Sequence, residues 1–335
     1  MTTPVLLGDL SEAEVLAAIL PLLPAGTHTE LGPGDDSAVV RVPGARMVVS
    51  TDTMIEGPDF RQAWSSPFDL GWKLVAVNLA DIAAMGAVPS SLVIALAAPP
   101  ETPLETITQL ARGIAAACAE LAPELGVVGG DLASAPTLVL SATALGHLDG
   151  QAPIRRDGAQ LGDVVAVAGV LGQAARALHL LFAHAVDVDG HADAARAASL
   201  IAREPELFAA QLRPVPPIAS GVVAAKAGAH AMLDVSDGLA KDAGRIAVAS
   251  HIGIRFDPSA FSDDPLFELY GGEDHSLLAT FAKGTALPEG FRRIGEVVAE
   301  PGSLWFGSAR IEPRGWEALA DWQARPNEQQ GAVDR

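Results

Sequence analysis

Aspartates recur along this chain at the points where short apolar runs end. Apolar runs of this length form strands or buried helix segments, so each would deliver carboxylates to one end of an ordered element. Hard divalent cations take oxygen ligands, and Mg²⁺ is usually held by a few carboxylates together with substrate phosphates. The pattern therefore predicts an enzyme that handles nucleotide phosphates through metal ions. Its segments are Gly34-Asp35-Asp36, Ser50-Thr51-Asp52-Thr53, Asn78-Leu79-Ala80-Asp81, Gly129-Gly130-Asp131, Asp234-Val235-Ser236-Asp237-Gly238 and Gly271-Gly272-Glu273-Asp274.

The composition is that of a globular protein with a strongly acidic balance. Of 335 residues, 49% are hydrophobic and 19% are charged, and the formal net charge is −19. A chain of this length is long enough for two domains, since one core rarely grows past about 250–300 residues. Nucleic acid is not expected as a partner, because phosphate backbones need clustered Lys and Arg. We expect part of the acidity to serve solubility and part to hold metal ions.

The N-terminal segment, the hydropathy and the single cysteine further limit the class of protein. The chain shows no basic region followed by an apolar core at its start and no run of 18 apolar residues. We therefore expect no signal peptide, no membrane partner and a cytoplasmic location. The single cysteine, Cys118, excludes an intramolecular disulfide and a multi-thiolate metal site. It lies on the apolar side of the helix expected at 104–121, where we expect it to pack in the core.

Strand-like and helix-like segments alternate along the chain, which predicts an α/β (α+β) fold in two layered domains. The first helix should begin at Ser11, which forms a capping-box pattern with Glu14. A boundary near Gly150 predicts domains at 8–150 and 151–318, with a polar, flexible tail at 323–335. Further helices are expected at 67–85, 104–121, 174–183, 192–201, 218–227, 239–250 and 265–270, and strands at 38–42, 47–50, 91–97, 137–146, 163–168, 231–234, 253–256 and 275–281.

The first-half motifs suggest ligand contacts of different kinds. Ser50 to Thr53 follow the apolar residues 47–49, so we expect them at a strand end, where open α/β sheets bind ligands. Asp81 interrupts an apolar run, and a carboxylate in such surroundings needs a partner or a metal. Gly130, expected in a turn, would let the backbone approach a phosphate closely because it lacks a Cβ. Gly34-Asp35-Asp36 taken alone is more typical of a plain turn, since Gly and Asp dominate turns.

The turn at 234–238 is the strongest motif of the second half. It places two carboxylates and a hydroxyl directly before an expected helix. The N-terminus of that helix could accept a phosphate oxygen. The histidines show no ligand spacing; His184 and His191 fall in a polar loop, where we expect them to be solvated.

Together and in this order, the motifs resemble those of the thiamine-monophosphate kinase family, within the aminoimidazole-ribonucleotide-synthetase-like ATP-binding superfamily. The resemblance spans roughly residues 8–318, and its most specific parts are 78–87 and Ser236-Asp237-Gly238. It implies the two-domain fold of that superfamily, with mixed α/β N-terminal and C-terminal domains. It also implies a homodimer joined through strands of the N-terminal halves.

The activity implied by the resemblance is a direct transfer. The γ-phosphoryl of ATP would pass to the phosphate of thiamine monophosphate, giving thiamine diphosphate and ADP. Several Mg²⁺ ions would assist, no phosphoenzyme would form, and no side chain would act as a covalent catalyst.

The resemblance also assigns roles to individual residues. Asp59 stands where some relatives carry histidine, and it would contact the substrate together with Glu273 and Trp316, which would hold the thiamine end. Nucleotide contacts would be Gly130, Asp131, Arg156 and Ser236. Metal ligands would be Asp36, Ser50, Thr51, Asp52, Asp81, Asp131, Asp234 and Asp237.

Physical reasoning agrees with these roles but leaves alternatives for three residues. Phosphoryl transfer needs positioning and charge neutralisation, and the chain has no Walker A pattern that would supply them. Arg156 suits a phosphate clamp, or else it is a solvated loop arginine beside Arg155. Trp316 would stack on a substrate ring, or else pack on the core. Glu273 would pair with a cationic or amino-bearing ring, or else be an ordinary turn acid.

Two other functions compete with the kinase. One is another ATP-dependent enzyme of the same superfamily, such as a cyclo-ligase of purine synthesis. The other is an acidic nucleotide- or metal-binding module without turnover. A selenophosphate synthetase is disfavoured, because that family carries a reactive Cys or Sec near its N-terminus and the cysteine here is Cys118.

Overall fold

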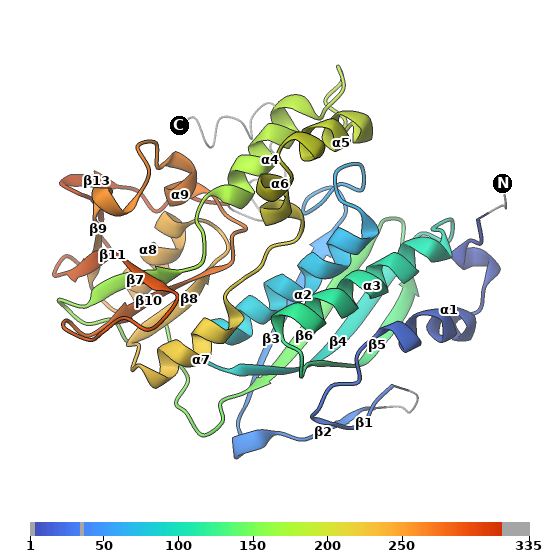
Figure 1. Ribbon diagram of the computed structural model, residues 1–335, viewed down its shortest axis with the longest axis horizontal. Coiled ribbons are helices and arrows are strands. Elements are labelled where there is room, and N and C mark those ends of the chain that lie inside the picture. The colour runs from blue at the N-terminus through green and yellow to red at the C-terminus, as the bar shows by residue number, and fades with distance from the viewer. Residues whose placement is uncertain (1–3, 34–36, 317–335) are drawn as a thin grey trace. The chain divides into compact units, whose positions relative to one another are not determined.

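The computed structural model describes residues 4–33 and 37–316 (Figure 1). The chain divides into two compact units, one of residues 1–82 with 88–150 and one of residues 83–87 with 151–335. Each unit combines helices with a β-sheet, so the mixed α/β fold expected from the sequence is confirmed. The motif residue Asp36 and the expected tail at 323–335 lie outside the described residues.

The first unit is built on a sheet with the strand order β3-β6-β4-β5. Strand β6 runs antiparallel to β3 and β4, and β5 runs parallel to β4. Helix α1 (Glu12–Ile19) begins at the expected capping box, because the Ser11 side chain accepts from the Glu14 backbone and Glu14 reaches back. The other bounds are β1 (Thr29–Leu31), β2 (Val39–Val40), β3 (Met47–Ile55), α2 (Pro67–Ala84), β4 (Val88–Ala98), α3 (Leu104–Leu121), β5 (Gly126–Ser134) and β6 (Val139–His147).

The sheet of the first unit has one covered and one open face. Along β4, Leu92 and Ile94 are buried whereas Val93 and Ala95 are exposed, as expected for alternating side chains. Helices α2 and α3 lie along the covered face in Figure 1. The Cys118 thiol is buried in this layer, and burial raises its pKa to about 12, so the expected core role of the cysteine is confirmed.

The second unit is built on a longer sheet with the order β13-β12-β9-β11-β7-β10-β8. Its neighbours are antiparallel except for the parallel pair β12 and β9. Helix α8 packs its apolar side onto this sheet, where Ile246 meets the core around Ile254 and Leu278. The strands are β7 (Val164–Ala168), β8 (Ala231–Val235), β9 (Gly253–Phe256), β10 (Ser276–Phe281), β11 (Phe291–Val298), β12 (Leu304–Phe306) and β13 (Ala309–Ile311).

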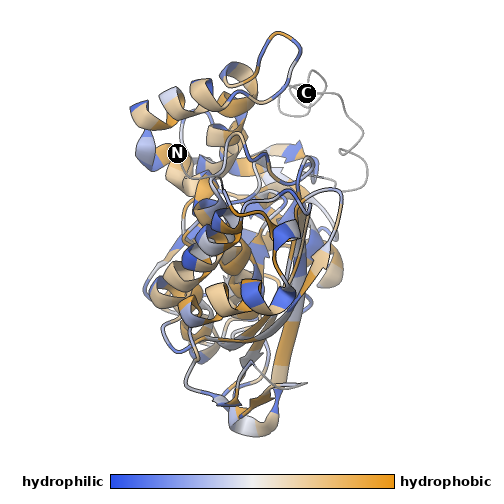
Figure 2. Cartoon of the chain, turned by 90° about the vertical axis from the view of Figure 1, so that its right-hand side faces the viewer, coloured by the Kyte–Doolittle hydropathy of each residue, from blue (hydrophilic) through white to orange (hydrophobic). Residues whose placement is uncertain are grey.

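Helices of the second unit form a group of their own beside this sheet. Helices α4, α5 and α6 contact one another, and α9 contacts both α4 and α8. The helices drawn in Figure 2 carry both hydrophobic and hydrophilic residues, as expected for helices with one side packed against the protein. The bounds are α4 (Gln173–His184), α5 (Ala194–Arg203), α6 (Pro205–Leu212), α7 (Ile218–Lys226), α8 (Leu239–Ala249) and α9 (Leu266–Tyr270).

Two motifs differ in local structure from the sequence expectation. The strand expected at 47–50 continues to Ile55, so Ser50 to Thr53 lie inside β3 and not at its end. The expected turn at Gly129-Gly130-Asp131 is part of strand β5. In both places the partner strand continues the hydrogen-bond ladder past the polar residues, and this pairing outweighs the local turn preference of Gly and Asp.

The described helices contain no segment with both the length and the apolar character that a membrane crossing needs.

Candidate functional site

In the first unit, two of the candidate carboxylates lie between β3 and α2. The Ser50 hydroxyl donates to Asp81 Oδ2 at 2.5 Å. The backbone N–H of Asp52 donates to Asn78 Oδ1 at 3.1 Å. Asn78 and Asp81 are three residues apart and therefore neighbours on the helix surface. The structure thus brings together Ser50, Asp52 and Asp81, a set of oxygen donors of the kind that Mg²⁺ prefers.

Asn78 belongs to this arrangement although no motif assigned it a role of its own. Its side chain is fully buried, and its Nδ2 donates to the Leu74 carbonyl at 2.8 Å while its Oδ1 holds Asp52. Both ends of the amide are therefore satisfied, one by the helix and one by the strand. A polar residue in the middle of a buried helical run was the signal that could have identified it.

Thr51 and Asp131 face away from this cluster. Side chains alternate along a strand, so Thr51 points to the open face when Ser50 and Asp52 point toward α2. The Thr51 hydroxyl donates to the Ala142 carbonyl at 2.9 Å, and Thr143 donates to Thr51 at 3.1 Å. Asp131 is exposed on β5 and lies in register with the exposed Ala95. The structure therefore divides the candidate metal ligands of the first unit between the two faces of the sheet.

Gly130 is explained by strand packing. A Cβ at Gly130 would lie 2.2 Å from the Ile94 carbonyl oxygen on β4, closer than any side chain permits. A Cβ at Gly129 would meet nothing within 4 Å. The contact between β4 and β5 therefore requires glycine at 130, independently of any approach of a phosphate.

Asp59 closes the turn that follows β3. Its Oδ2 accepts from the Ile55 backbone N–H at 2.7 Å, and its own N–H donates to the Ile55 carbonyl at 3.0 Å. The residue is exposed. These bonds fix the orientation of the Asp59 carboxylate relative to the backbone.

In the second unit, Asp234 lies near the end of β8 and pairs with a histidine. Asp234 Oδ2 is 3.2 Å from His275 Nδ1, and both side chains are buried. The His275 backbone N–H also donates to the Val235 carbonyl at 3.0 Å. Strand β8 and the segment before β10 are thereby joined beside the aspartate turn.

The turn at 236–238 is the point where the second-unit candidates meet. The Ser236 carbonyl accepts from the Glu273 backbone N–H at 2.8 Å, and the Asp237 carbonyl accepts from the Trp316 N–H at 2.9 Å. A Cβ on Gly272 would lie 2.4 Å from the Ser236 oxygen, so the close approach requires glycine. The structure therefore brings together Ser236, Asp237, Glu273 and Trp316.

The Asp237 carboxylate is surrounded by cations. Its Oδ2 lies 3.2 Å from Lys241 Nζ and also pairs with Arg245. Arg245 in turn bonds to Asp242. A metal ion at Asp237 would have to share the carboxylate with these two cations, so Asp237 fits a metal-binding role less directly than Asp52 and Asp81 do.

Asp242 organises the same turn and was missed from the sequence. Its Oδ2 accepts from the backbone N–H groups of Asp237 at 3.0 Å and Gly238 at 3.1 Å, and the side chain is fully buried. Burial raises its pKa to about 7, which the guanidinium of Arg245 partly opposes. An aspartate in the first turn of the helix after a Gly-containing turn was the available signal.

The backbone of Arg156 is hydrogen-bonded, whereas its side chain is exposed. Its carbonyl accepts from the Ser250 hydroxyl at 2.9 Å, whereas the guanidinium forms no ion pair with the described residues. The neighbouring Arg155 pairs with Asp157 instead. Of the two adjacent arginines, only Arg155 forms an ion pair with the described residues, so the Arg156 guanidinium is the better candidate to bind a phosphate.

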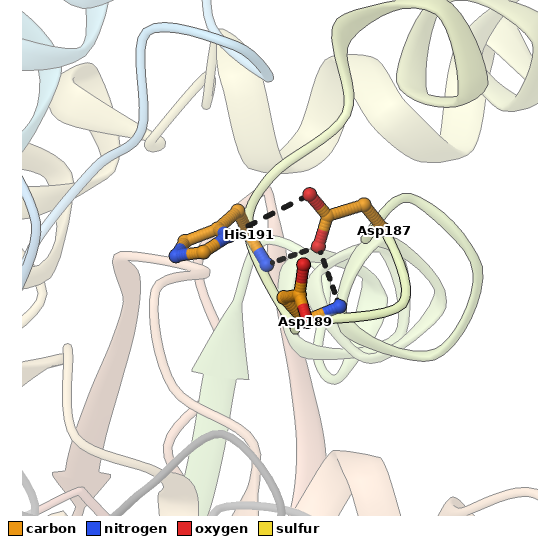
Figure 3. Close-up of side chains that lie close together, drawn as sticks. All are labelled: Asp187, Asp189 and His191. Carbon is orange, nitrogen blue, oxygen red and sulfur yellow. Dashed lines mark hydrogen bonds and ion pairs between the residues drawn. The ribbon is translucent and has the colours of Figure 1, made fainter.

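An exposed loop between α4 and α5 gathers three further polar side chains (Figure 3). Ligand atoms of Asp187, Asp189 and His191 lie within 4.8 Å of one another. The Asp187 carboxylate accepts from the backbone N–H groups of Asp189 and His191, each at 2.9 Å, which lowers its pKa. These bonds account for the arrangement as a loop-closing turn, and His191 is exposed as expected.

Both units therefore present carboxylates and hydroxyls beside ordered strands and turns, an arrangement that suits an α/β protein which handles phosphates through metal ions. Residues 34–148 match the sequence profile described as "AIR synthase related protein, N-terminal domain". The thiamine-monophosphate kinase of Mycobacterium tuberculosis is 39% identical over 311 residues, which cover 88% of this chain and 85% of that protein. The chain belongs to the thiamine-monophosphate kinase family.

Solved structures agree with this assignment. The thiamine-monophosphate kinase of Stenotrophomonas maltophilia K279a has a TM-score of 0.71 and 34% identity, covering 89% of this chain and 96% of that one. AaThiL, complexed with AMPPCP and TMP, has a TM-score of 0.70 and 28% identity, covering 84% of this chain and 90% of that one.

Proposed function

We propose that this chain transfers the γ-phosphoryl group of ATP to the phosphate of thiamine monophosphate, giving thiamine diphosphate and ADP. The observation that carries the proposal is the extent of the likeness to the Mycobacterium tuberculosis kinase, which runs over 88% of the chain and so includes both units. The AaThiL structure supports the pair of substrates, because it holds AMPPCP, which mimics ATP, together with TMP.

Several Mg²⁺ ions are proposed to assist the transfer. Asp52 and Asp81, with the Ser50 hydroxyl, supply the best-fitting oxygen donors of the described residues. When bound, Mg²⁺ neutralises the phosphate groups, whose mutual repulsion otherwise opposes the reaction. The further proposed ligands are Thr51, Asp131, Asp234, Asp237 and, outside the described residues, Asp36.

The chain's own contribution is positioning. No covalent intermediate is proposed, since phosphoryl transfer depends on alignment and charge neutralisation. Glu273 and Trp316 both bond to the turn at 236–238. A substrate ring held by these two residues is therefore fixed relative to Ser236, the proposed nucleotide contact. Asp59 is proposed to contact the substrate, and Gly130, Asp131 and Arg156 the nucleotide.

The two domains are proposed to have different roles. We propose that residues 8–150 form the domain that binds ATP and Mg²⁺ and that residues 151–318 complete the enzyme. We also propose a cytoplasmic homodimer joined through the first unit. The open face of its sheet supports the dimer, because it exposes the apolar side chains of Met47, Val49, Ile55 and Val93, which a second copy would cover.

The deciding experiment measures ADP production by the purified protein with ATP and Mg²⁺, with and without thiamine monophosphate, and identifies the product. Stimulation by thiamine monophosphate together with formation of thiamine diphosphate is the expected result. ATP binding without stimulation would instead favour another enzyme of the superfamily or a non-catalytic binding module. Omission of Mg²⁺ should abolish turnover if the metal is required.

A further inference from the structure

Gln211, on helix α6, carries a buried amide that reaches the proposed substrate residue Glu273. Its Nε2 donates to Glu273 Oε2 at 3.0 Å, and the side chain is only 6% exposed. Helix α6 contributes none of the motif residues found in the sequence. The contact therefore connects Glu273 to a part of the second unit that has no assigned role.

The carboxylate of Glu273 determines which way the Gln211 amide points. An ionised carboxylate only accepts hydrogen bonds, so it selects the NH₂ end of the amide. The other end, Oε1, is buried and has no hydrogen-bond partner among the described residues. A buried acceptor without a partner destabilises a fold. Stability alone would therefore favour an apolar side chain of the same length at position 211.

What glutamine adds at this position is the donor to Glu273. The backbone of Glu273 is also fixed, since its φ of 70° lies in the left-handed region and its N–H bonds to the Ser236 carbonyl at 2.8 Å. Left-handed backbone is unfavourable for a residue with a Cβ, so glutamate at position 273 carries a conformational cost. Ser236 therefore holds the backbone of Glu273, and Gln211 holds one of its carboxylate oxygens. Together the two contacts set the orientation of the carboxylate.

We propose that Gln211 is a positioning residue that orients the Glu273 carboxylate toward an amino-bearing or cationic ring and so determines specificity for that ring. The inference rests on the proposed function, in which Glu273 holds the thiamine end of the substrate. Thiamine carries an amino group on its pyrimidine ring, and an oriented carboxylate is the acceptor that such a donor requires. Gln211 acts through Glu273 and not on the reacting phosphates.

The test replaces Gln211 by methionine, which has similar length and no polar end. Gln211→Met is expected to raise KM for thiamine monophosphate about tenfold, as the loss of a hydrogen bond to a charged group predicts. We expect kcat and KM for ATP to stay within about twofold. The Tm should equal or exceed that of the wild type, because the unpaired Oε1 is removed. A residue with a purely structural role would show the reverse, a lower Tm with unchanged KM.

A matched control exists on helix α3. Gln109 Nε2 donates to Glu105 Oε1 at 2.6 Å, so Gln109→Met removes the same kind of glutamine–glutamate bond on a helix that carries none of the candidate residues. This variant should leave both KM values unchanged. A rise in KM for thiamine monophosphate in both variants would overturn the specific role of Gln211.

Specificity gives a second readout. An analogue in which the pyrimidine amino group is replaced by a carbonyl should be a poor substrate for the wild type. The preference for the amino form should shrink by about tenfold in Gln211→Met. An active wild type whose preference is unchanged in the variant would overturn this inference alone. A wild type that forms no thiamine diphosphate would instead refute the proposed function, and the inference with it.

Discussion

The backbone N–H of Trp316 donates a hydrogen bond to the carbonyl oxygen of Asp237 at 2.9 Å. Lys241 strengthens this connection, because its Nζ bonds to the Trp316 carbonyl and lies 3.2 Å from Asp237 Oδ2. A residue proposed to hold the thiamine ring is therefore tied to the turn proposed to hold nucleotide and metal. Displacement of either one would displace the other.

Replacement of Lys241 by methionine tests this connection. The Lys241 side chain is only 12% exposed, and Lys241→Met keeps its length while removing both bonds. We expect KM for thiamine monophosphate to rise roughly three- to tenfold, because Trp316 loses one of its two attachments. Steady-state kinetics with each substrate varied in turn would measure the change.

The control is Lys226→Met, at the exposed end of α7. It removes the same charge from the same unit without touching the turn and should leave KM unchanged. Equal effects of the two substitutions would mean that net charge, and not the attachment of Trp316, governs substrate binding.

Asp52→Asn should stop turnover without unfolding the chain. Asparagine keeps the shape of the side chain, and the hydrogen bond from the residue 52 backbone to Asn78 does not depend on the carboxylate. The lost charge would weaken neutralisation of the phosphates, so we expect kcat to fall by about 100-fold or more. Activity assays together with circular dichroism would separate lost chemistry from lost fold.

Asp69→Asn is the matched control for that variant. Asp69 is bonded to Ser66 at the start of α2, the helix that also carries Asp81. Asparagine keeps an oxygen that can accept from Ser66, so the substitution should lower stability by only about 0.3–1 kcal/mol, through the lost charge near the helix N-terminus, and leave kcat close to that of the wild type. Normal turnover by Asp52→Asn would show that Asp52 is not a required ligand.

The sequence predicted element types well because the apolar periodicity was strong. The capping box at Ser11 and the helix 104–121 appear as expected, since both depend on residues close in sequence. Helix α6 and strands β11 to β13 were not anticipated, because they follow prolines and loops whose local pattern is weak. The positions of Ser50 to Thr53 inside β3 depended on pairing with β6, which a single sequence does not reveal.

For the candidate site, the sequence indicated candidate residues but not their surroundings. Motif residues Ser236, Asp237, Glu273 and Trp316 do converge on one turn. The side chains that organise the sites, Asn78, Asp242 and Gln211, lie outside the roles the motifs assigned. The separation of Thr51 from Asp52 follows from strand alternation once β3 extends past residue 50. Such partners become visible only when distant segments are placed side by side.

Adjacent arginines offer an internal comparison for the nucleotide contact. Arg155 pairs with Asp157, whereas the Arg156 guanidinium is exposed and forms no ion pair with the described residues. Arg156→Ala should raise KM for ATP roughly tenfold if the guanidinium clamps a phosphate. Arg155→Ala should change KM for ATP less than twofold. The opposite order would assign the clamp to Arg155.

The pH dependence of stability should reveal the buried carboxyl of Asp274. Burial raises its pKa from 3.8 to about 6, although the backbone N–H groups of Ala174 and Gly172 and the nearby His275 favour ionisation. Because the folded pKa exceeds the unfolded one, folding takes up a proton between these values. The contribution of the group to the free energy of unfolding is therefore complete below about pH 3.8 and lost as pH rises through about 6.

Asp274→Asn does not titrate, so it isolates this effect. The stability of the wild type relative to Asp274→Asn should fall by roughly 2–3 kcal/mol between pH 4 and pH 7, measured by urea unfolding at both values. Asp257→Asn is a control of opposite sign, because bonds from Ser259 lower the pKa of the exposed Asp257 carboxylate. The stability of the wild type relative to Asp257→Asn should increase as pH rises through the lowered pKa of Asp257. If the relative stability of Asp274→Asn did not change with pH, the pKa of Asp274 would be the same in the folded and unfolded chain. The backbone N–H groups of Gly172 and Ala174 would then offset the effect of burial.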